Sequence, residues 1–167
     1  MLFRSGQLGG IAEYFKQRYP QTKIIGIDVA GSVVFGTPQH AYKMTGLGLS
    51  FVPPNFDPDS LDAAYTIDDR LAFSVCHALA RKEGLLLGAS TGAIVAGTLA
   101  YVSQCKSPQR VLMINPDRGD RYLETVYNAE WLAQQQISLW QEPELSQVIA
   151  SLQPVPFDVL RSVGTAA

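Results

Sequence analysis

The chain has 167 residues, of which 47% are hydrophobic, and its formal net charge is -2. This length suits one domain, whose core would bury roughly 70% of the surface that the unfolded chain exposes. The Lys and Arg residues are scattered and no apolar run approaches the ~20 residues of a membrane span, so neither nucleic acid nor a membrane is an expected partner. The sequence shows no signal-peptide pattern, and a cytoplasmic location is expected. Cys76 and Cys105 lack metal-site spacing and are interpreted as reduced packing thiols, with no metal site expected.

The first half of the chain alternates helical and strand patterns. Apolar side chains at helical spacing predict an amphipathic helix over residues 8–19. The near-continuous apolar run of residues 23–30 predicts a strand covered on both faces. The Gly- and Pro-rich stretch 31–58 is too long for a simple connection and is interpreted as a functional loop. Residues 63–67 predict another strand, and Asp68 or Asp69 is expected to cap a helix that ends at Gly84.

A glycine-hinged turn follows. Residues 85–87 are predicted to form a short buried parallel strand, and Ser90 is predicted as the N-cap of the next helix. Small residues on one side of that helix would allow either close packing or the approach of a ligand. Residues 110–115 predict a further strand, and Asn128 is expected to cap a helix over residues 129–136.

This alternation predicts an α/β fold with a parallel sheet that carries helices on both faces. Ligand sites in such folds lie at the carboxyl ends of the strands, and Ser90 follows one such end. The body of the domain is expected to end near residue 136. Residues 137–167 are then a C-terminal extension with two amphipathic pieces and a mobile end at 162–167.

Two motif interpretations of the Ser90 turn are disfavoured. Residues 88–92 match the G-x-S-x-G pattern of a serine nucleophile, but in that hydrolase fold the histidine follows the serine. His40 and His77 both precede Ser90 and are interpreted as surface or loop residues. A nucleotide site is disfavoured because the sequence contains neither G-x-G-x-x-G nor G-x-x-x-x-G-K.

Several separated segments together resemble the C-terminal half of a pyridoxal-phosphate enzyme of the cysteine synthase and cystathionine β-synthase family. Residues 10–15 and 23–32 are similar to the helix and strand that follow the family's phosphate loop. Residues 40–53 resemble its H-K-I-Q-G-I-G-x-x-F-V-P loop, and residues 68–97 follow its run ending in G-x-S-S-G-A-A. Residues 118–123 match its G-x-R-Y-L turn. The resemblance implies the large domain of fold type II enzymes, N-terminally truncated, with pyridoxal phosphate as cofactor.

The resemblance also implies roles for individual residues. Ser90 takes the position of the serine that hydrogen-bonds the pyridine nitrogen of the cofactor, and Gly88 and Thr91 support the ring edge. Gly6 retains part of the phosphate loop. The substrate-side loop consists of three further positions: Thr45, Gly46 and Gly48. A hydroxyl partner makes the ring a weaker electron sink than a carboxylate partner would, which suits β-replacement on an O-substituted serine.

The chain departs from the family pattern in one respect that decides its chemistry. None of its lysines lies in the family's S-x-K setting, so no catalytic residue is assigned and the chain alone is expected to be inactive. An N-terminal partner chain or a homodimer would then complete the site, with small amino acids as substrates. Residues 31–36 and 116–127 look most like the branch that joins O-phosphoserine to glutamate in 2,3-diaminopropionate biosynthesis. A cysteine synthase fragment and a non-catalytic binding module are the alternatives.

Overall fold

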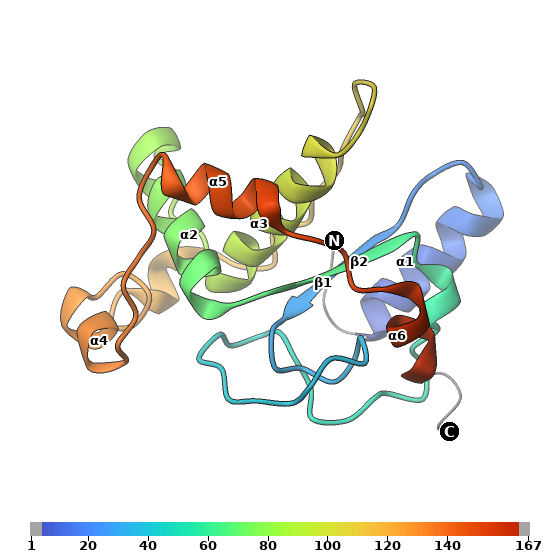
Figure 1. Cartoon of the computed structure of the whole chain (residues 1–167), viewed down its shortest axis with the longest axis horizontal. Helices are drawn as coiled ribbons and strands as arrows, with labels where there is room; N and C mark the ends of the chain where they lie inside the picture. Colours follow the sequence, from blue (N-terminus) through green and yellow to red (C-terminus); the bar gives the residue numbers. More distant parts are fainter. Residues whose placement is uncertain (1–4, 164–167) are drawn as a thin grey trace.

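A computed structural model describes residues 5–163 of the chain (Figure 1). Its centre is a pair of parallel strands, β1 (Ile25–Val29) and β2 (Ala63–Ile67), aligned so that Ile27 pairs with Tyr65. Both strands occur where the sequence predicts them. The expected mobile end lies partly outside the described residues, since residues 164–167 are not described.

Helices cover both faces of this sheet, as the sequence predicts. Figure 1 shows α2 (Asp69–Glu83), α3 (Ala89–Ser103) and α5 (Glu144–Ser151) on one side of the strands. On the other side lie α1 (Ser5–Arg18) and α6 (Phe157–Ser162). Successive strand residues point to opposite faces, so each side has its own core cluster. Among the described residues, no helix combines the length and apolar character needed to cross a membrane.

Local sequence signals set the ends of the helices. The Asp68 carboxylate accepts the Leu71 N–H at 2.7 Å and caps α2, which ends at Gly84 in the left-handed conformation (φ 68°). The Asn128 side chain likewise accepts the Trp131 N–H at 2.9 Å and caps α4 (Ala129–Gln134). Both caps agree with the sequence prediction. Two short 3-10 helices, η1 (Pro58–Ser60) and η2 (Gly119–Tyr122), complete the described elements.

Two predicted strands do not form. Residues 85–87 make one isolated antiparallel bridge, between Leu87 and Arg118, and Leu85 is 48% exposed. Residues 110–115 are irregular, with Leu112 73% exposed. A strand requires a neighbour for its backbone hydrogen bonds, and the described sheet offers neither segment a partner. Both segments are apolar in the sequence, but neither joins the described sheet, so the prediction of these two strands is wrong.

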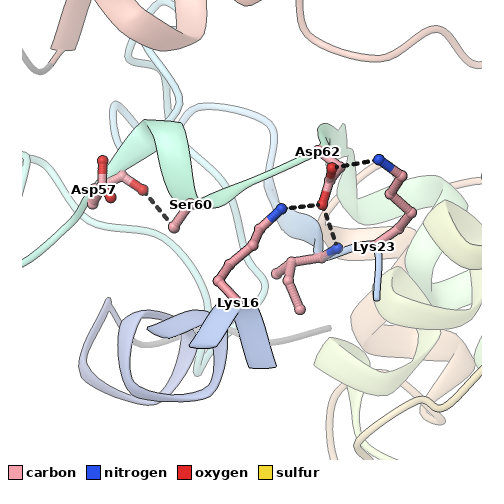
Figure 2. A network of polar contacts seen from close by, with 6 residues as sticks. Lys16, Lys23, Asp57, Ser60 and Asp62 are labelled. Atoms are coloured by element: carbon pink, nitrogen blue, oxygen red, sulfur yellow. Dashed lines mark hydrogen bonds and ion pairs between the residues drawn. The ribbon is translucent and has the colours of Figure 1, made fainter. Parts of the chain in front are cut away.

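One carboxylate links α1 to the N-terminal ends of both strands. Asp62, just before β2, accepts hydrogen bonds from Lys16 at 2.8 Å, from Lys23 at 3.0 Å and from the Ile24 N–H at 2.8 Å (Figure 2). Although burial opposes the change, these three donors lower the pKa of the Asp62 carboxyl. The network therefore holds helix and sheet together through a charge that persists at neutral pH.

The C-terminal residues pack onto the body of the fold. The Trp140 N–H bonds the Ser74 hydroxyl at 2.8 Å, and Arg70 stacks 3.4 Å over the Trp140 ring. The Val155 N–H bonds the Ala64 carbonyl at 2.8 Å, on the side of β2 that faces away from β1. This segment thus covers one edge of the sheet. A domain boundary near residue 136 stays a prediction.

Candidate functional site

Ser90 is the second residue of α3, not its N-cap as the sequence predicts. Gly88 is the N-cap, with extended angles (φ -72°, ψ 159°), and its carbonyl accepts the Thr91 N–H at 2.9 Å. The glycine backbone thus begins the helix without help from a side chain. Ser90 is 3% exposed, and its hydroxyl bonds none of the residues that the structure describes. A buried hydroxyl at the positive end of a helix is therefore free to meet a ligand.

The histidines are not placed to activate Ser90. The His77 Nε2 lies 2.8 Å from the Val126 carbonyl oxygen, and its ring packs against Tyr127 at a centroid distance of 5.2 Å. His40 is exposed on the long loop and contacts the Ala41 carbonyl at 3.1 Å. The structure thus agrees with the sequence order in disfavouring a serine hydrolase.

The small residues of α3 serve close packing. A Cβ at Gly92 would lie 2.2 Å from the Ala72 carbonyl oxygen, and one at Gly97 would lie 2.3 Å from Cδ1 of Ile27. These glycines let α3 press against α2 and β1. Burial raises the pKa of the neighbouring Cys76 thiol to about 12, so this cysteine is the packing thiol that the sequence predicts.

Tyr127 holds the segment that leads into the turn. Its hydroxyl donates to the Leu87 carbonyl at 2.6 Å and accepts the Leu87 N–H at 3.2 Å. Burial raises the pKa of Tyr127, which keeps its donor proton in place. Together with the antiparallel bridge to Arg118, this side chain holds Leu87 in place.

The carboxylate of Asp117 lies against Gly88, the N-cap of α3. Its Oδ2 accepts the Tyr122 hydroxyl at 2.6 Å, whereas its Oδ1 is buried without a partner among the described residues. A Cβ at Gly88 would lie 1.8 Å from that Oδ1, so only glycine fits beneath it. Burial and then the Asp117 hydrogen bond raise the pKa of Tyr122, while a hydrogen bond from Thr45 works in the opposite direction. Gly88, Asp117 and Tyr122 therefore form one connected group.

Thr91 joins the turn to the segment before Asp117. Its hydroxyl donates to Oδ1 of Asn115, and Thr91 is itself buried. The Gly88 N–H donates to the Asp117 carbonyl at 3.2 Å, which adds a backbone link between the same two segments. The predicted role of Thr91 at a ring edge stays a prediction, since its hydroxyl has a partner within the chain.

The predicted substrate-side loop lies at the carboxyl end of β1. Gly46 and Gly48 have left-handed backbone angles (φ 87° and 80°) that favour glycine. Thr45 and Gly46 are exposed, and a Cβ at Gly48 would lie 2.5 Å from both Val29 and the Tyr42 hydroxyl. The loop tip is thus open to solvent while its base is packed against the strand.

Three polar residues to which the sequence assigns no role in the site lie at the base of this loop. The Asp69 carboxylate accepts the backbone N–H groups of Lys43 at 2.6 Å and Met44 at 2.8 Å. Ser32 accepts the Leu49 N–H at 3.0 Å. Burial raises the pKa of Asp28, although Ser32 and backbone N–H groups stabilise its charge. In the sequence, Asp28 could have been recognised as a candidate site residue because it is a carboxyl within an otherwise apolar strand.

Gly6 and the lysines lie on several different elements. Gly6 is in the first turn of α1, and its predicted role in a phosphate loop stays a prediction. Lys16 and Lys23 pair with Asp62, and Lys82 pairs with Glu142. The remaining lysines, Lys43 and Lys106, are exposed. The described lysines are thus either paired with a carboxylate or exposed.

The chain resembles known proteins over most of its length. A family model described as pyridoxal-phosphate dependent enzyme matches residues 4–117. N-(2-amino-2-carboxyethyl)-L-glutamate synthase of Cupriavidus metallidurans is 40% identical over 132 residues, which are 77% of this chain and 39% of that protein. A cysteine synthase of Helicobacter pylori is 39% identical over 118 residues, which are 71% of this chain and 39% of that protein. The chain thus spans about two fifths of the length of these relatives.

Solved structures show the same fold. O-ureido-L-serine synthase superposes with a TM-score of 0.68 at 27% identity, over 77% of this chain and 44% of that one. The O-acetylserine dependent cystathionine beta-synthase from Helicobacter pylori gives a TM-score of 0.68 at 36% identity, over 72% and 40% of the two chains. These neighbours have the fold type II architecture that the sequence predicts.

The residues present fit one end of pyridoxal phosphate. A free, buried Ser90 hydroxyl is a suitable donor to a pyridine nitrogen, and unpaired Asp117 Oδ1 adds an acceptor beside the same turn. The aldehyde carbon of the cofactor needs an amine, and Lys16, Lys23 and Lys82 are each paired with a carboxylate. The described residues therefore suit the ring-nitrogen end of the cofactor and offer no partner for its aldehyde end.

Proposed function

Because this chain belongs to the family of pyridoxal-phosphate-dependent enzymes, we propose that it supplies the ring-nitrogen side of a cofactor site in a β-replacement enzyme. The observation that carries this proposal is the Ser90 hydroxyl, buried at the start of α3 without a partner among the described residues. When bound, pyridoxal phosphate withdraws electrons from the bonds of an attached amino acid. Ser90 would hold the ring nitrogen, with Gly88 and Thr91 beside it.

The loop around Thr45 is the proposed substrate side. Its open tip is fixed at the base by Asp69 and by the packing of Gly48, so exposed groups are held in a defined place. Tyr122, whose pKa Thr45 helps to lower, donates to Asp117, which lies against Gly88 of the Ser90 turn. The substrate class is an O-phospho- or O-acetylserine together with a nucleophile. Glutamate is the proposed nucleophile, giving a diaminopropionate precursor, because the Cupriavidus relative is a synthase of an aminocarboxyethyl glutamate.

The lysine-bearing side is proposed to come from another polypeptide or a second copy of the chain. A cysteine synthase fragment is the second candidate, favoured by the 39% identity to the Helicobacter enzyme. A non-catalytic binding module is the third, favoured by the pairing of Lys16, Lys23 and Lys82 with carboxylates. The first two differ in nucleophile and share the cofactor site.

A cofactor analogue without an aldehyde tests the proposal directly. Pyridoxine phosphate cannot form a covalent bond to lysine, so its binding reports only the noncovalent site. We expect it to shift the amide resonances of Ser90 and Thr91, and Ser90→Ala to weaken its binding about tenfold. Ser103→Ala, on the same helix, is the matched control. Failure of the analogue to shift these resonances would refute the proposal.

The lysine argument has its own test. Borohydride treatment of the chain with pyridoxal phosphate is expected to leave no cofactor on a specific lysine, because the described lysines are either paired with a carboxylate or exposed. A stoichiometric adduct at one lysine would contradict the proposed need for a second polypeptide.

A further inference from the structure

We propose that the Asp117 carboxylate is the counter-charge of the ring-nitrogen site, so that a pyridine nitrogen held at Ser90 is bound in its protonated form. The inference rests on the proposed function, because Ser90 must be the partner of that nitrogen. What is added is the charge state of the ring that the site selects. Three observations carry it: the place of Asp117, its unpaired oxygen, and the lack of an ion pair to it among the described residues.

Asn115 and Asp117 contact both ends of the turn that holds Ser90. The Asn115 side chain accepts the Thr91 hydroxyl, and the Asp117 carbonyl accepts the Gly88 N–H at 3.2 Å. Ser90 lies between these two contacts in the chain. Its Cα lies roughly 5.5 Å from that of Gly88, because the intervening residue is helical. Since Asp117 Oδ1 lies against Gly88, its charge acts on the Ser90 site from about one helical turn away.

Oδ1 of Asp117 is a buried acceptor without a donor. Oδ2 accepts the Tyr122 hydroxyl at 2.6 Å, which fixes the carboxylate, whereas Oδ1 accepts no hydrogen bond from the described residues. Tyr122 keeps its proton, because its pKa is raised, with Arg121 acting weakly in the opposite direction. A capping role would require Oδ1 to accept an N–H of α3, and it accepts none from the described part of that helix. An unpaired buried acceptor is costly, so it would stabilise a positive charge in the adjacent site.

No cation among the described residues pairs with Asp117. The basic residue next to it in the chain, Arg118, pairs with Asp120 at 3.2 Å. Burial and, in smaller part, the Asp117 charge raise the pKa of the Cys76 thiol on α2 to about 12, so this thiol stays neutral. The first turn of α3 carries no acidic residue that would share the role. The Asp117 charge is thus left for a ligand to balance.

The two neighbours of the ring nitrogen predict opposite changes in its pKa. A Ser90 hydroxyl that donates to the nitrogen stabilises the unprotonated form and lowers the pKa. A carboxylate within about 4–6 Å stabilises the protonated form and raises the pKa by about one to three pH units. Because a hydroxyl oxygen also has acceptor lone pairs, Ser90 can accept the ring N–H when Asp117 holds the nitrogen protonated. The sign of the change therefore decides whether Asp117 acts on the site.

Pyridoxine phosphate with an isotopic label at its ring nitrogen tests the proposal. The nitrogen resonance reports whether the nitrogen carries a proton, and it is followed across neutral and alkaline pH for the free analogue and for the analogue bound to the wild-type chain. We expect the bound nitrogen to lose its proton about one pH unit or more above the free nitrogen. A bound value equal to the free value, or below it, would overturn the proposal.

Two Asp→Asn variants separate the local charge from the net charge. Asp117→Asn keeps the shape of the side chain and removes its charge, so the bound value is expected to fall to the free value or below it. Asp120→Asn makes the same change at an exposed residue that pairs with Arg118, and it is expected to keep the raised value. An equal fall in both variants would assign the effect to net charge and contradict the role of Asp117. Circular dichroism checks that both variants fold, and the wild-type titration does not depend on them.

The outcomes separate this inference from the proposed function. If the analogue shifts the amide resonances of Ser90 and Thr91 while its nitrogen titrates at or below the free value, the ring-nitrogen site stands and the role of Asp117 is removed. If the analogue does not bind, the ring-nitrogen site is itself refuted, and the role of Asp117 with it.

Discussion

Gly88→Ala is expected to disturb the turn at Ser90 through one side chain, Asp117. The backbone angles of Gly88 suit alanine, so the substitution creates no backbone strain. Its Cβ, however, would lie 1.8 Å from Oδ1 and 2.7 Å from Cγ of Asp117, and 2.9 Å from the Tyr122 ring. Overpacking of this kind costs about 1–3 kcal/mol, and alanine is a poorer N-cap than glycine by about 0.5–1 kcal/mol. The free energy of unfolding should therefore fall by about 1.5–4 kcal/mol.

A double-mutant cycle isolates the clash. Asp117→Ala removes the hydrogen bond from Tyr122 and also the unpaired oxygen, so it should cost only about 0–1 kcal/mol. In that background the clash with Asp117 is gone and the approach to the Tyr122 ring remains, so Gly88→Ala should cost the cap difference of about 0.5–1 kcal/mol plus a smaller overpacking cost. Urea unfolding followed by circular dichroism measures all four proteins. Additivity of the two substitutions within about 0.5 kcal/mol would refute the reasoning. Gly10→Ala, with no atom within 4 Å of its Cβ, is the control and should not destabilise the helix.

Two further predictions concern titratable groups. Because its pKa is lowered, Asp62 stabilises the fold fully above the unfolded carboxyl value of about 3.9, and this contribution is lost as the pH falls through the lower folded value. In urea unfolding between about pH 5 and about pH 2, the free energy of unfolding should fall less for Asp62→Asn than for wild type. Parallel pH dependences of the two proteins would exclude Asp62 as a source of the loss of stability in acid. Cys76 is buried with a pKa of about 12, whereas Cys105 is half-buried, so a thiol reagent should label Cys105 in the native protein and Cys76 only in urea. Rapid labelling of both in native buffer would contradict the packing of Cys76.

Local chemistry explains why some elements could be predicted. Asp68 and Asn128 accept N–H groups within three residues of themselves, and Gly84 adopts an angle that glycine favours. Such signals act within a few residues and can be read along the chain. Ser90 shows the limit, because the preceding Gly88 already begins the helix by its own backbone.

Part of the candidate site was predicted from family resemblance and not from local helix and turn signals. Resemblance of separated segments identified the family and the turn at Ser90, whereas the residues that surround the turn depend on distant contacts. Asp117 reaches Gly88, and Tyr127 bonds Leu87 from 40 residues away. No periodic pattern encodes such contacts, and Asp28 was visible only as a carboxyl within an apolar strand.

The sequence alone determined the family, both strands that form, the caps at Asp68, Gly84 and Asn128, and the absence of a family-type lysine setting. Only the tertiary structure decided which apolar segments join the sheet and which side chains surround Ser90. Residues 110–115 have the apolar character of a strand, yet pairing requires a neighbour within hydrogen-bond reach, and the described chain provides none. The apolar pattern of a strand can be read from one segment, whereas sheet formation also depends on which other segment lies beside it, and only the tertiary packing decides that.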